Sequence, residues 1–390
     1  MSDGLSQKIV RLSDWCEKRN FAGADPYDAL NSRLAPLLTL NTKYGRVFWT
    51  QVLRRSPIDL RPLLLVPPGR NPKGLGLFLE SYCRMAILQP EETRWRDSAR
   101  KLLAGLQETV SSGYHGNCWG YHFPWQSWVA FVPRGVPTIV NTAFIGHALL
   151  DAWQVWKSEE ALTLAFSTAD FMLNDLNRKQ EKDTFCFSYT PLDHNYVHNA
   201  NLLGASLLAR LAITTGRPEL AAPAQESMAY SMAHQHEDGS WYYGEHQAQR
   251  YIDSFHTGFN LESLRRVLKL KLAPDGWTEA FERGKKYYRE TFFGEDFTPK
   301  YYHDRVYCVD AHAPAEAIYF FAGEGAAGGD FAGKLLEWFF THMYDPGHGY
   351  FYYRKTGEKV SKIPYMRWVE AWALRGLTEY CYRVEGKNQT

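Results

Sequence analysis

Two histidines in this sequence each follow an aspartate by two or three residues. Asp253 precedes His256 in the stretch YIDSFHTGFNLESL, and Asp310 precedes His312 in YCVDAHAPAEAI. An aspartate that accepts a hydrogen bond from one ring nitrogen fixes the imidazole tautomer and raises its basicity. His256 and His312 are therefore the leading catalytic candidates, although a histidine at such a place can also do no more than cap a helix.

Other side chains near similar helix starts could assist these histidines. Arg367 has the planar fork that binds a carboxylate through two hydrogen bonds, and a neighbouring Asp or Glu could equally occupy that fork. Tyr302, in PKYYHDRVYCVDAH, is a candidate acid. A carboxylate pair, Asp253 with Asp310 or Glu370, would suit glycoside hydrolysis instead.

Metal binding is the other chemistry that histidines supply. His194 and His198 are four residues apart, but the sequence around them indicates a loop, and no third ligand has a diagnostic spacing. His115, Cys118 and His122 form a cluster with the same weakness. We therefore expect no metal and no other cofactor.

The elements that must position these side chains are mostly helices. Apolar residues recur at i, i+3 and i+4 in segments bounded by Gly, Pro, Asn or Asp, and no segment alternates as a long strand does. Short aromatic hairpins are expected at 240–250 and 349–362. The predicted helices are 75–88, 94–110, 138–156, 159–176, 199–213, 217–235, 254–271, 276–290, 311–323, 330–343 and 365–382.

Five of these helices begin at matching points of an internal repeat. The matching points are 58, 57, 56 and 56 residues apart along the chain, and more strongly charged helices lie between them. Alternation of apolar and amphipathic helices predicts an inner and an outer ring. The matching residues are Asn141, Asn199, His256, His312 and Trp368.

The fold class that follows is all-α, an (α/α)6 toroid of six helix hairpins with short β-hairpins in the loops at the cavity mouth. Residues 71–385 would form the toroid, and residues 1–70 an N-terminal arm and outer helices packed on it, so that the chain is effectively a single domain. An open solenoid and two packed bundles are the alternatives. The steady period and the lack of a recognisable end-capping repeat favour a closed ring.

In such a toroid the matched helix starts point into one end of the central cavity. Their free N–H groups and dipoles make that end suitable for an anion such as a carboxylate. The loops leading there contain many of the 13 Trp and 24 Tyr residues, and flat rings stack on sugars. We expect sugar stacking by Trp241, Trp368 and Tyr196, and further substrate contacts from Asn199, His198, Asp253, Asp310, Arg367 and Glu370.

The composition narrows the class of protein. The formal net charge of +1 does not fit nucleic-acid binding, which needs a basic surface. The six cysteines are scattered without a CxxC pair, as in reducing compartments. The chain starts without the features of a signal peptide, and no apolar run approaches 18 residues. We therefore expect a cytoplasmic protein without a membrane span.

Several stretches together resemble one bacterial family. TPLDHNYVHNANLLGASLLARL, DGSWYYGE, IDSFHTGFNLESL, PKYYHDRVYCVDAH and KIPYMRW resemble, in order, the VpsJ-like exopolysaccharide-biosynthesis proteins over roughly residues 110–385. The resemblance implies an (α/α)6 toroid and a link to surface-polysaccharide assembly, but no established reaction and no catalytic residues. The sequence departs from the group around Cys308, Pro314 and Glu316, close to His312. More distantly, the architecture is similar to uronate C5-epimerases, polysaccharide lyases and N-acylglucosamine 2-epimerases.

The resulting functional prediction is a carbohydrate-active enzyme of surface-polysaccharide biosynthesis or modification. It would abstract a proton next to a uronate carboxylate, as a C5-epimerase or lyase does, with His256 and Tyr302 or His312 as base and acid. Arg367 and Asn199 would stabilise the developing charge. The alternatives are a glycoside hydrolase, a sugar 2-epimerase-like isomerase and a non-catalytic glycan-binding subunit of a polysaccharide assembly complex. The expected partner is a glycan or sugar intermediate, and other polysaccharide-biosynthesis proteins are candidate partners.

Overall fold

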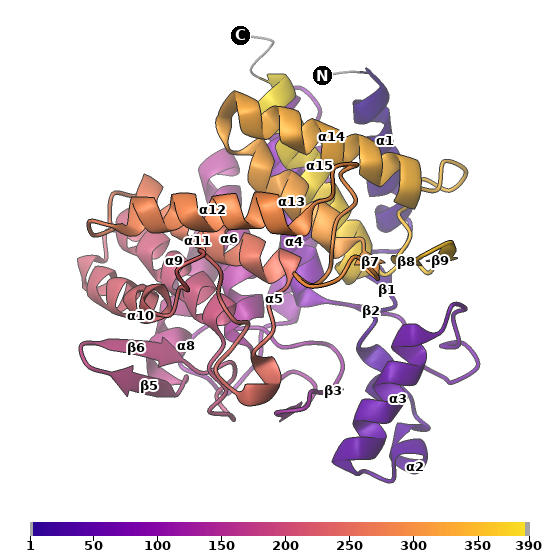
Figure 1. Ribbon diagram of the computed structural model, residues 1–390, viewed down its shortest axis with the longest axis horizontal. Helices are drawn as coiled ribbons and strands as arrows, with labels where there is room; N and C mark the ends of the chain where they lie inside the picture. The colour runs from indigo at the N-terminus through magenta and orange to yellow at the C-terminus, as the bar shows by residue number, and fades with distance from the viewer. Residues whose placement is uncertain (1–2, 387–390) are drawn as a thin grey trace.

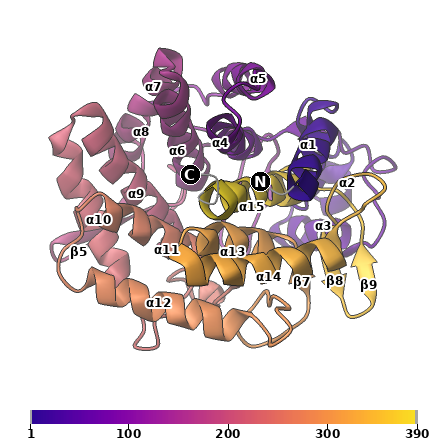
Figure 2. The same cartoon turned by 90° about the horizontal axis from the view of Figure 1, so that it is seen from above.

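The computed structural model describes residues 3–386, and within this range six helices form an inner ring (Figure 1, Figure 2). Each inner helix packs against the next one around the ring, and the last packs against the first, so that the ring is closed. This confirms the expected all-α (α/α)6 toroid. The inner helices are α4 (Pro72–Leu88), α6 (Ile139–Trp156), α9 (His198–Thr215), α11 (Ser254–Lys269), α13 (His312–Ala322) and α15 (Trp372–Tyr380).

A second ring of helices covers the first, as Figure 2 shows. Five inner helices each pack against the outer helix that follows in the chain, and α1 (Asp3–Glu17) packs on α15. The tie between α1 and the inner ring includes a hydrogen bond of 2.9 Å from the Tyr82 hydroxyl to Glu17 Oε1. The other outer helices are α5 (Arg94–Glu108), α7 (Glu159–Phe166) with α8 (Thr168–Asn174), α10 (Ala221–Ala233), α12 (Trp277–Phe292) and α14 (Gly325–Met343).

Side-chain caps fix the starts of three inner helices, α4, α6 and α11. Asn71 Oδ1 accepts the backbone N–H of Lys73 at 3.0 Å, with Pro72 at the first helical position. Asp253 Oδ1 accepts the N–H of His256, also at 3.0 Å. Helix α15 instead follows a π-helical turn, Met366–Ala371. The caps define the helix starts, and the loops before these starts converge at one end of the toroid, the cavity mouth.

Short strand pairs lie in the connecting segments. The hairpin expected at 349–362 is confirmed by β8 (Arg354–Thr356) and β9 (Lys359–Ser361), to which β7 (Val309–Asp310) adds. The prediction of a hairpin at 240–250 is wrong, because this segment is an irregular loop with a short 3-10 turn at Gln247–Gln249. The remaining pairs are β1 (Ala22–Gly23) with β2 (Gly69–Arg70), β3 (Trp125–Gln126) with β4 (Phe131–Val132), and β5 (Arg178–Glu181) with β6 (Thr184–Phe187).

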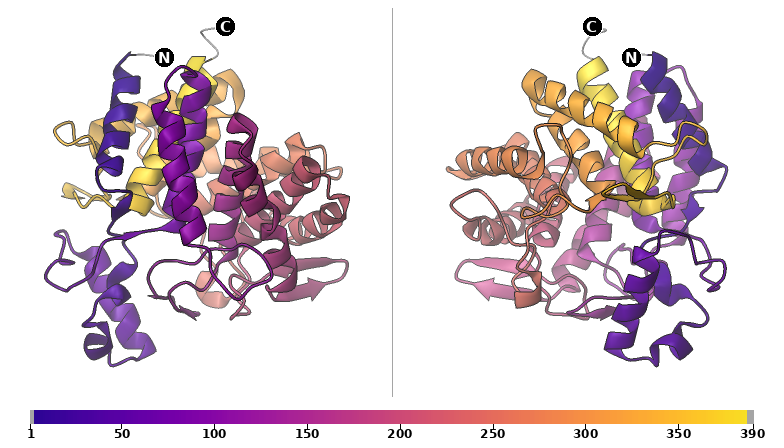
Figure 3. Two further views of the ribbon diagram at one scale, coloured as in Figure 1. Left: turned by 180° about the vertical axis from the view of Figure 1, so that it is seen from behind. Right: turned by 45° about the vertical axis from the view of Figure 1, so that its right-hand side comes forward.

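Residues 22–70 form an arm that extends beside the cavity mouth, as both views of Figure 3 show. The arm carries the 3-10 turn Asp28–Asn31 and helices α2 (Ala35–Thr39) and α3 (Lys43–Arg55), and the β1–β2 pair ties its two ends together. Helix α3 also contacts β3 of the long insert 113–137. The arm therefore reaches the end of the toroid where the inner helices start.

Below the mouth, the interior of the ring contains an aromatic layer. Phe144, Phe259 and Trp372 lie five or six residues into their helices or helical turns and are buried. Their ring centroids are 5.1 to 5.2 Å apart. This layer is the floor on which the mouth residues rest.

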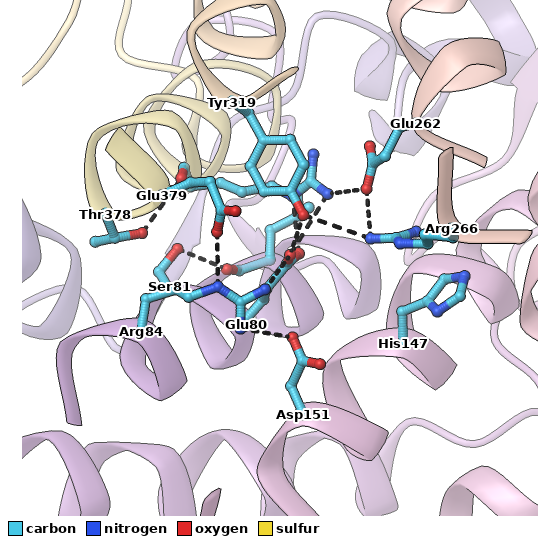
Figure 4. Close-up of polar contacts among 12 residues, drawn as sticks. Glu80, Ser81, Arg84, His147, Asp151, Glu262, Arg266, Tyr319, Thr378 and Glu379 are labelled. Atoms are coloured by element: carbon cyan, nitrogen blue, oxygen red, sulfur yellow. Dashed lines mark hydrogen bonds and ion pairs between the residues drawn. The ribbon is translucent and has the colours of Figure 1, made fainter. Parts of the chain in front are cut away.

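Deeper still, an ionic network links all six inner helices, and Figure 4 shows the part of it around Glu80, Arg84 and Glu262. The buried Arg375 of α15 donates to Glu80 of α4 at 2.8 Å, Glu262 of α11 at 2.6 Å and Glu316 of α13 at 3.0 Å. The network continues through Arg84 to Asp151 of α6 at 3.1 Å. Asp151 in turn accepts from Arg210 of α9. The mouth is therefore the polar, aromatic-lined end of the toroid, and the far end is held together by charge.

Within residues 3–386, none of the helices has both the length and the apolar character needed to cross a membrane.

Candidate active site

A cavity of about 230 Å³ lies at the mouth of the toroid. The loops that lead into α6, α9, α11 and α13 contribute to its wall, the π-helical turn before α15 adds Arg367 and Trp368, and the N-terminal arm adds Tyr27, Val47, Thr50 and Gln51. Phe, Tyr and Trp side chains form a large part of the wall. Of the residues predicted from the sequence, Asn199, His256, His312, Arg367 and Trp368 line this single cavity.

His256 forms a dyad with Asp253. Its Nδ1 lies 2.7 Å from Asp253 Oδ2, while Asp253 Oδ1 accepts the His256 backbone N–H at 3.0 Å. Both oxygens of the buried carboxylate are therefore committed to one residue, and the imidazole is held with Nε2 free for a ligand. The same aspartate caps α11, so the start of the helix and the orientation of the ring are set together.

His312 is the opposite kind of histidine. It is buried, and neither ring nitrogen has a hydrogen-bond partner among the described residues. Its ring lies between aromatic faces, with centroids 4.4 Å from Phe255, 4.3 Å from Trp372 and 4.6 Å from Trp368. Burial lowers the pKa of His312 well below its usual value, and the nearby Lys73 cation lowers it further. His312 is therefore a neutral imidazole with both nitrogens open to a ligand.

The two histidines lie close to one another. The Phe259 ring is 5.7 Å from the His256 ring and 5.9 Å from the His312 ring, measured between centroids. The Asn199 side chain also lines the cavity, and its buried Oδ1 lacks a partner within residues 3–386. A ligand seated above Phe259 could contact both imidazoles.

Arg367 is less available for binding a substrate carboxylate than the sequence indicated. Its Nε and Nη2 donate to the two oxygens of Asp25 at 2.6 and 2.7 Å, and both side chains are buried. The fork is thus occupied by an aspartate of the arm, which neutralises its charge. Of the two partners that the sequence allowed for Arg367, a substrate carboxylate or an acidic residue of the protein, the structure contains the second.

The carboxylates expected to bind substrate lie behind the cavity wall. Asp253 supports His256. Asp310 accepts from the Trp368 indole N–H at 2.8 Å and from the backbone N–H of His312 at 3.1 Å. Glu370 accepts the Phe351 N–H at 3.0 Å, and burial raises its pKa well above normal. Among the described residues that line the cavity there is no Asp or Glu. The acid pair expected for glycoside hydrolysis is therefore absent from the cavity surface in residues 3–386.

Four more of the expected residues lie outside the cavity. Trp241 is 2% exposed and donates its indole N–H to the Ser231 carbonyl at 2.9 Å, so it cannot stack on a sugar. His198 is buried against Ser231, with 3.3 Å between Nδ1 and Oγ. Tyr196 contacts His194 at 3.3 Å and does not line the cavity.

The fourth, Tyr302, is displaced by its neighbour. Tyr301 lines the cavity, whereas the ring of Tyr302 packs edge-on against Tyr251 outside it. The two rings lie against each other, with centroids 4.6 Å apart, but of the two only Tyr301 reaches the cavity wall. The expected role of Tyr302 as the acid therefore does not fit its position.

The sequence analysis missed other cavity residues. Lys73, in the first turn of α4, lines the cavity, as do Tyr121 and Tyr243. The two tyrosines occur in loops already noted for their aromatic content. The signal for Lys73 is its place directly after the Asn71–Pro72 helix start, which marks α4 as the first member of the inner ring.

Comparison with known proteins relates the chain to others through its fold. No protein-family model matches the sequence, and no curated protein matches it either. The chain is similar to cellobiose 2-epimerase from Bacillus thermoamylovorans, with a TM-score of 0.64, 13% identity, and coverage of 81% of this chain and 88% of that chain. It is also similar to unsaturated glucuronyl hydrolase from Bacillus sp. GL1, with a TM-score of 0.63, 13% identity, and coverage of 97% and 96%.

A third similar structure is the GH76 α-mannanase from Bacteroides thetaiotaomicron, with a TM-score of 0.58, 11% identity, and coverage of 81% of this chain and 87% of that chain. The chain shares the (α/α)6 toroid fold with these proteins. At such low identity the likeness extends to the fold alone.

Proposed function

We propose that the protein is a carbohydrate-active enzyme that transfers a proton at a sugar carbon next to a carboxylate or carbonyl. The observation that carries this proposal is the pair of different imidazoles, His256 and His312, in one aromatic cavity. The names of the similar structures, which include sugar epimerases and an isomerase as well as hydrolases, support the class. The lack of an acidic side chain on the described cavity wall favours epimerase, isomerase or lyase chemistry over hydrolysis.

The two histidines suit complementary roles. Asp253 orients the His256 imidazole and places a carboxylate 2.7 Å from its Nδ1, while burial keeps His312 neutral. Removal of a proton from one face of a carbon and delivery to the other needs one group of each kind. His312 would accept the proton and His256 would donate one, with the roles reversed in the reverse reaction. Asn199, with its unpartnered amide oxygen, would position a sugar hydroxyl.

The biological setting rests on the resemblance to the VpsJ-like group, which favours a substrate from surface-polysaccharide synthesis or modification. A uronate, reacting at C5 as an epimerase or lyase substrate, is the first candidate. A sugar 2-epimerase-like isomerase is the second, because Asp25 already occupies the arginine fork that was expected to hold a carboxylate.

Solvent-isotope exchange tests this proposal. The protein is incubated in D2O with uronic-acid polysaccharides and with reducing disaccharides, and the products are followed by NMR. Deuterium at C5 or an unsaturated uronate indicates the first candidate, and deuterium at C2 indicates the second. His256→Asn and His312→Asn should each reduce the exchange rate by about 10² or more.

The matched control is His115→Asn. His115 also pairs with an aspartate, Asp175, at 2.7 Å, but its side chain is 67% exposed and lies away from the cavity. This variant should exchange like the wild type. New reducing ends without deuterium incorporation would contradict the proposal, as would full exchange in both cavity variants.

A further inference from the structure

Lys73 is a buried cation at the cavity without a counter-ion. Its side chain lines the cavity and the residue is 4% exposed. Its Nζ lies over three aromatic rings, 4.3 Å from the centroid of Phe144, 5.1 Å from Trp372 and 5.5 Å from Phe259. No hydrogen bond or ion pair to Nζ is present within residues 3–386, and the cap at Asn71 accepts from the backbone N–H of Lys73, not from its side chain. A lysine in such a place is rarely left unpaired in a folded protein.

The other buried cations nearby are neutralised. Arg367 is paired with Asp25, and Arg375 is paired with Glu80 and Glu262. Lys73 therefore differs from both of its basic neighbours in having only aromatic faces, which attract a cation more weakly than a carboxylate does. Burial lowers the pKa of Lys73 well below its usual value, and the charges on Arg367 and Arg375 lower it further.

We propose that Lys73 binds the carboxylate of an acidic sugar, so that the cavity selects uronates over neutral sugars. This inference rests on the proposed carbohydrate function. It favours a uronate over a neutral sugar as the substrate, a choice that the pairing of Arg367 with Asp25 leaves open. The arginine is neutralised by the arm and cannot select for charge, whereas Lys73 completes an ion pair only when an anion enters. An acidic sugar supplies the missing counter-ion as part of the substrate.

The position of Lys73 also suits the chemistry. Trp372 contacts both Lys73, at 5.1 Å from Nζ, and His312, at 4.3 Å between ring centroids. A carboxylate held at Nζ therefore places the carbon that bears it beside the two imidazoles. When the C5–H bond breaks, its proton moves to one imidazole and its electron pair enters the carboxylate. The added negative charge then lies against the Lys73 ammonium.

Two outcomes follow from that intermediate. In epimerisation, the other imidazole returns a proton to C5 on the opposite face, and the electron pair forms the new C–H bond. In elimination, the electron pair forms the C4–C5 double bond, and the C4 oxygen leaves with a proton from the second imidazole. Both steps balance without any further reactant.

Ligand discrimination tests the role of Lys73 without requiring turnover. In the His256→Asn background, D-glucuronate and its methyl ester are titrated by calorimetry at pH 8. We expect the acid to bind about ten- to one-hundred-fold more tightly than the ester, as for a hydrogen bond to a charged group. The additional change Lys73→Met should bring the two affinities together while leaving thermal stability unchanged or higher, since methionine keeps the contacts with the rings.

Proton uptake provides an independent readout. Because Lys73 is easily deprotonated in the empty cavity, glucuronate binding should draw in a fraction of a proton. The binding enthalpy in phosphate and in Tris should then differ for the acid but not for the ester, and Lys73→Met should abolish that difference. The control is Lys334→Met, which removes a lysine over an aromatic ring, 5.2 Å from the Phe297 centroid, far from the cavity. It should bind like the parent protein.

Equal affinity for acid and ester, no glucuronate binding, or an acid preference that survives Lys73→Met would each overturn the inference. The proposed function is judged separately by isotope exchange. Exchange on neutral sugars at the same rate in wild type and Lys73→Met would leave that function standing and refute the role of Lys73. Acid-selective binding without exchange on any sugar would support the role of Lys73 and refute the proposed function.

Discussion

At the scale of single residues, the Asp253–His256 dyad makes a prediction that separates structure from chemistry. Asn is as good a helix cap as Asp, so Asp253→Asn should keep α11 in place and change the free energy of unfolding by less than about 1 kcal/mol. It removes the negative charge that lies 2.7 Å from the His256 Nδ1. The isotope-exchange rate should therefore fall by about 10²-fold or more.

A cap far from the cavity provides the comparison for that variant. Ser158 Oγ accepts the Ala161 N–H at 3.2 Å at the start of α7, so Ser158→Ala should cost about 1 kcal/mol of stability and leave exchange unchanged. If Asp253→Asn kept the full exchange rate, the dyad would have only its capping role.

Residue types and spacing identified part of the cavity and failed on the rest for definable reasons. The repeat located Asn199, His256, His312 and Trp368, because equivalent helix starts converge in a closed ring. It did not reach Lys73, since the insert 113–137 lengthens the interval between the first two inner helices. Trp241 and Tyr302 were misplaced because the sequence does not specify which side of an irregular loop a ring faces.

At the scale of elements, Asp25 ties the N-terminal arm to the cavity wall by pairing with Arg367. Removing this charge by Asp25→Asn leaves the buried Arg367 guanidinium without its counter-ion, and the free energy of unfolding should fall by about 3 kcal/mol. Arg367 should also lose its fixed position, so the KM for exchange should rise. Urea denaturation and exchange kinetics would measure the two effects.

Asp59→Asn is the matched variant on the same arm. Asp59 pairs with Arg61 at 3.2 Å, but its side chain is 39% exposed, and Arg61 retains a second carboxylate, Asp28, at 2.7 Å. Stability should change by less than about 1 kcal/mol. Similar losses in both variants would show that the Asp25–Arg367 pair has no special role in holding the arm.

Helices were predicted more reliably than strands for a physical reason. A buried face repeats every three or four residues along a helix, so α6 and α11 could be bounded to within two residues. The β5–β6 hairpin was missed because β5, with the sequence RKQE, is charged and mostly exposed and shows no alternation. The aromatic run at 240–245 looked like a strand, but its rings serve packing and the cavity wall.

At the scale of the whole molecule, the ring is joined by the ionic network below the aromatic layer. Burial alone would raise the pKa of Glu80, but Arg375 and Arg84 lower it to about 2. The arginines thus allow Glu80 to remain charged in the interior, whereas burial and the neighbouring Glu262 raise the pKa of Glu316 well above its usual value. Residues of the network come from all six inner helices in residues 3–386. Disrupting the network should therefore destabilise the closed ring as a whole and not a single contact.

Arg375→Met tests this dependence. It leaves Glu80, Glu262 and Glu316 without the guanidinium that joins them, so the free energy of unfolding at pH 7 should fall by about 3–5 kcal/mol. In the wild type, Glu80 contributes stability that is present above pH 4.5 and is lost as the pH falls toward 2. In the variant, Glu80 loses the cation that lowers its pKa most and takes up a proton more readily, so the deficit should be smaller at pH 5 than at pH 7.

The exposed pair Arg100–Asp97, 3.1 Å apart on α5, is the control for this variant, and Arg100→Met should change stability by less than about 1 kcal/mol. Adding Glu80→Gln to Arg375→Met should recover part of the loss, because it removes a buried charge, and Arg84, the other cation beside it, keeps its pairs with Asp151 and Glu379. Urea titrations at the two pH values would measure all four proteins. A deficit in Arg375→Met that does not depend on pH, with no recovery in the double variant, would mean that packing around the arginine, and not its charge, closes the toroid.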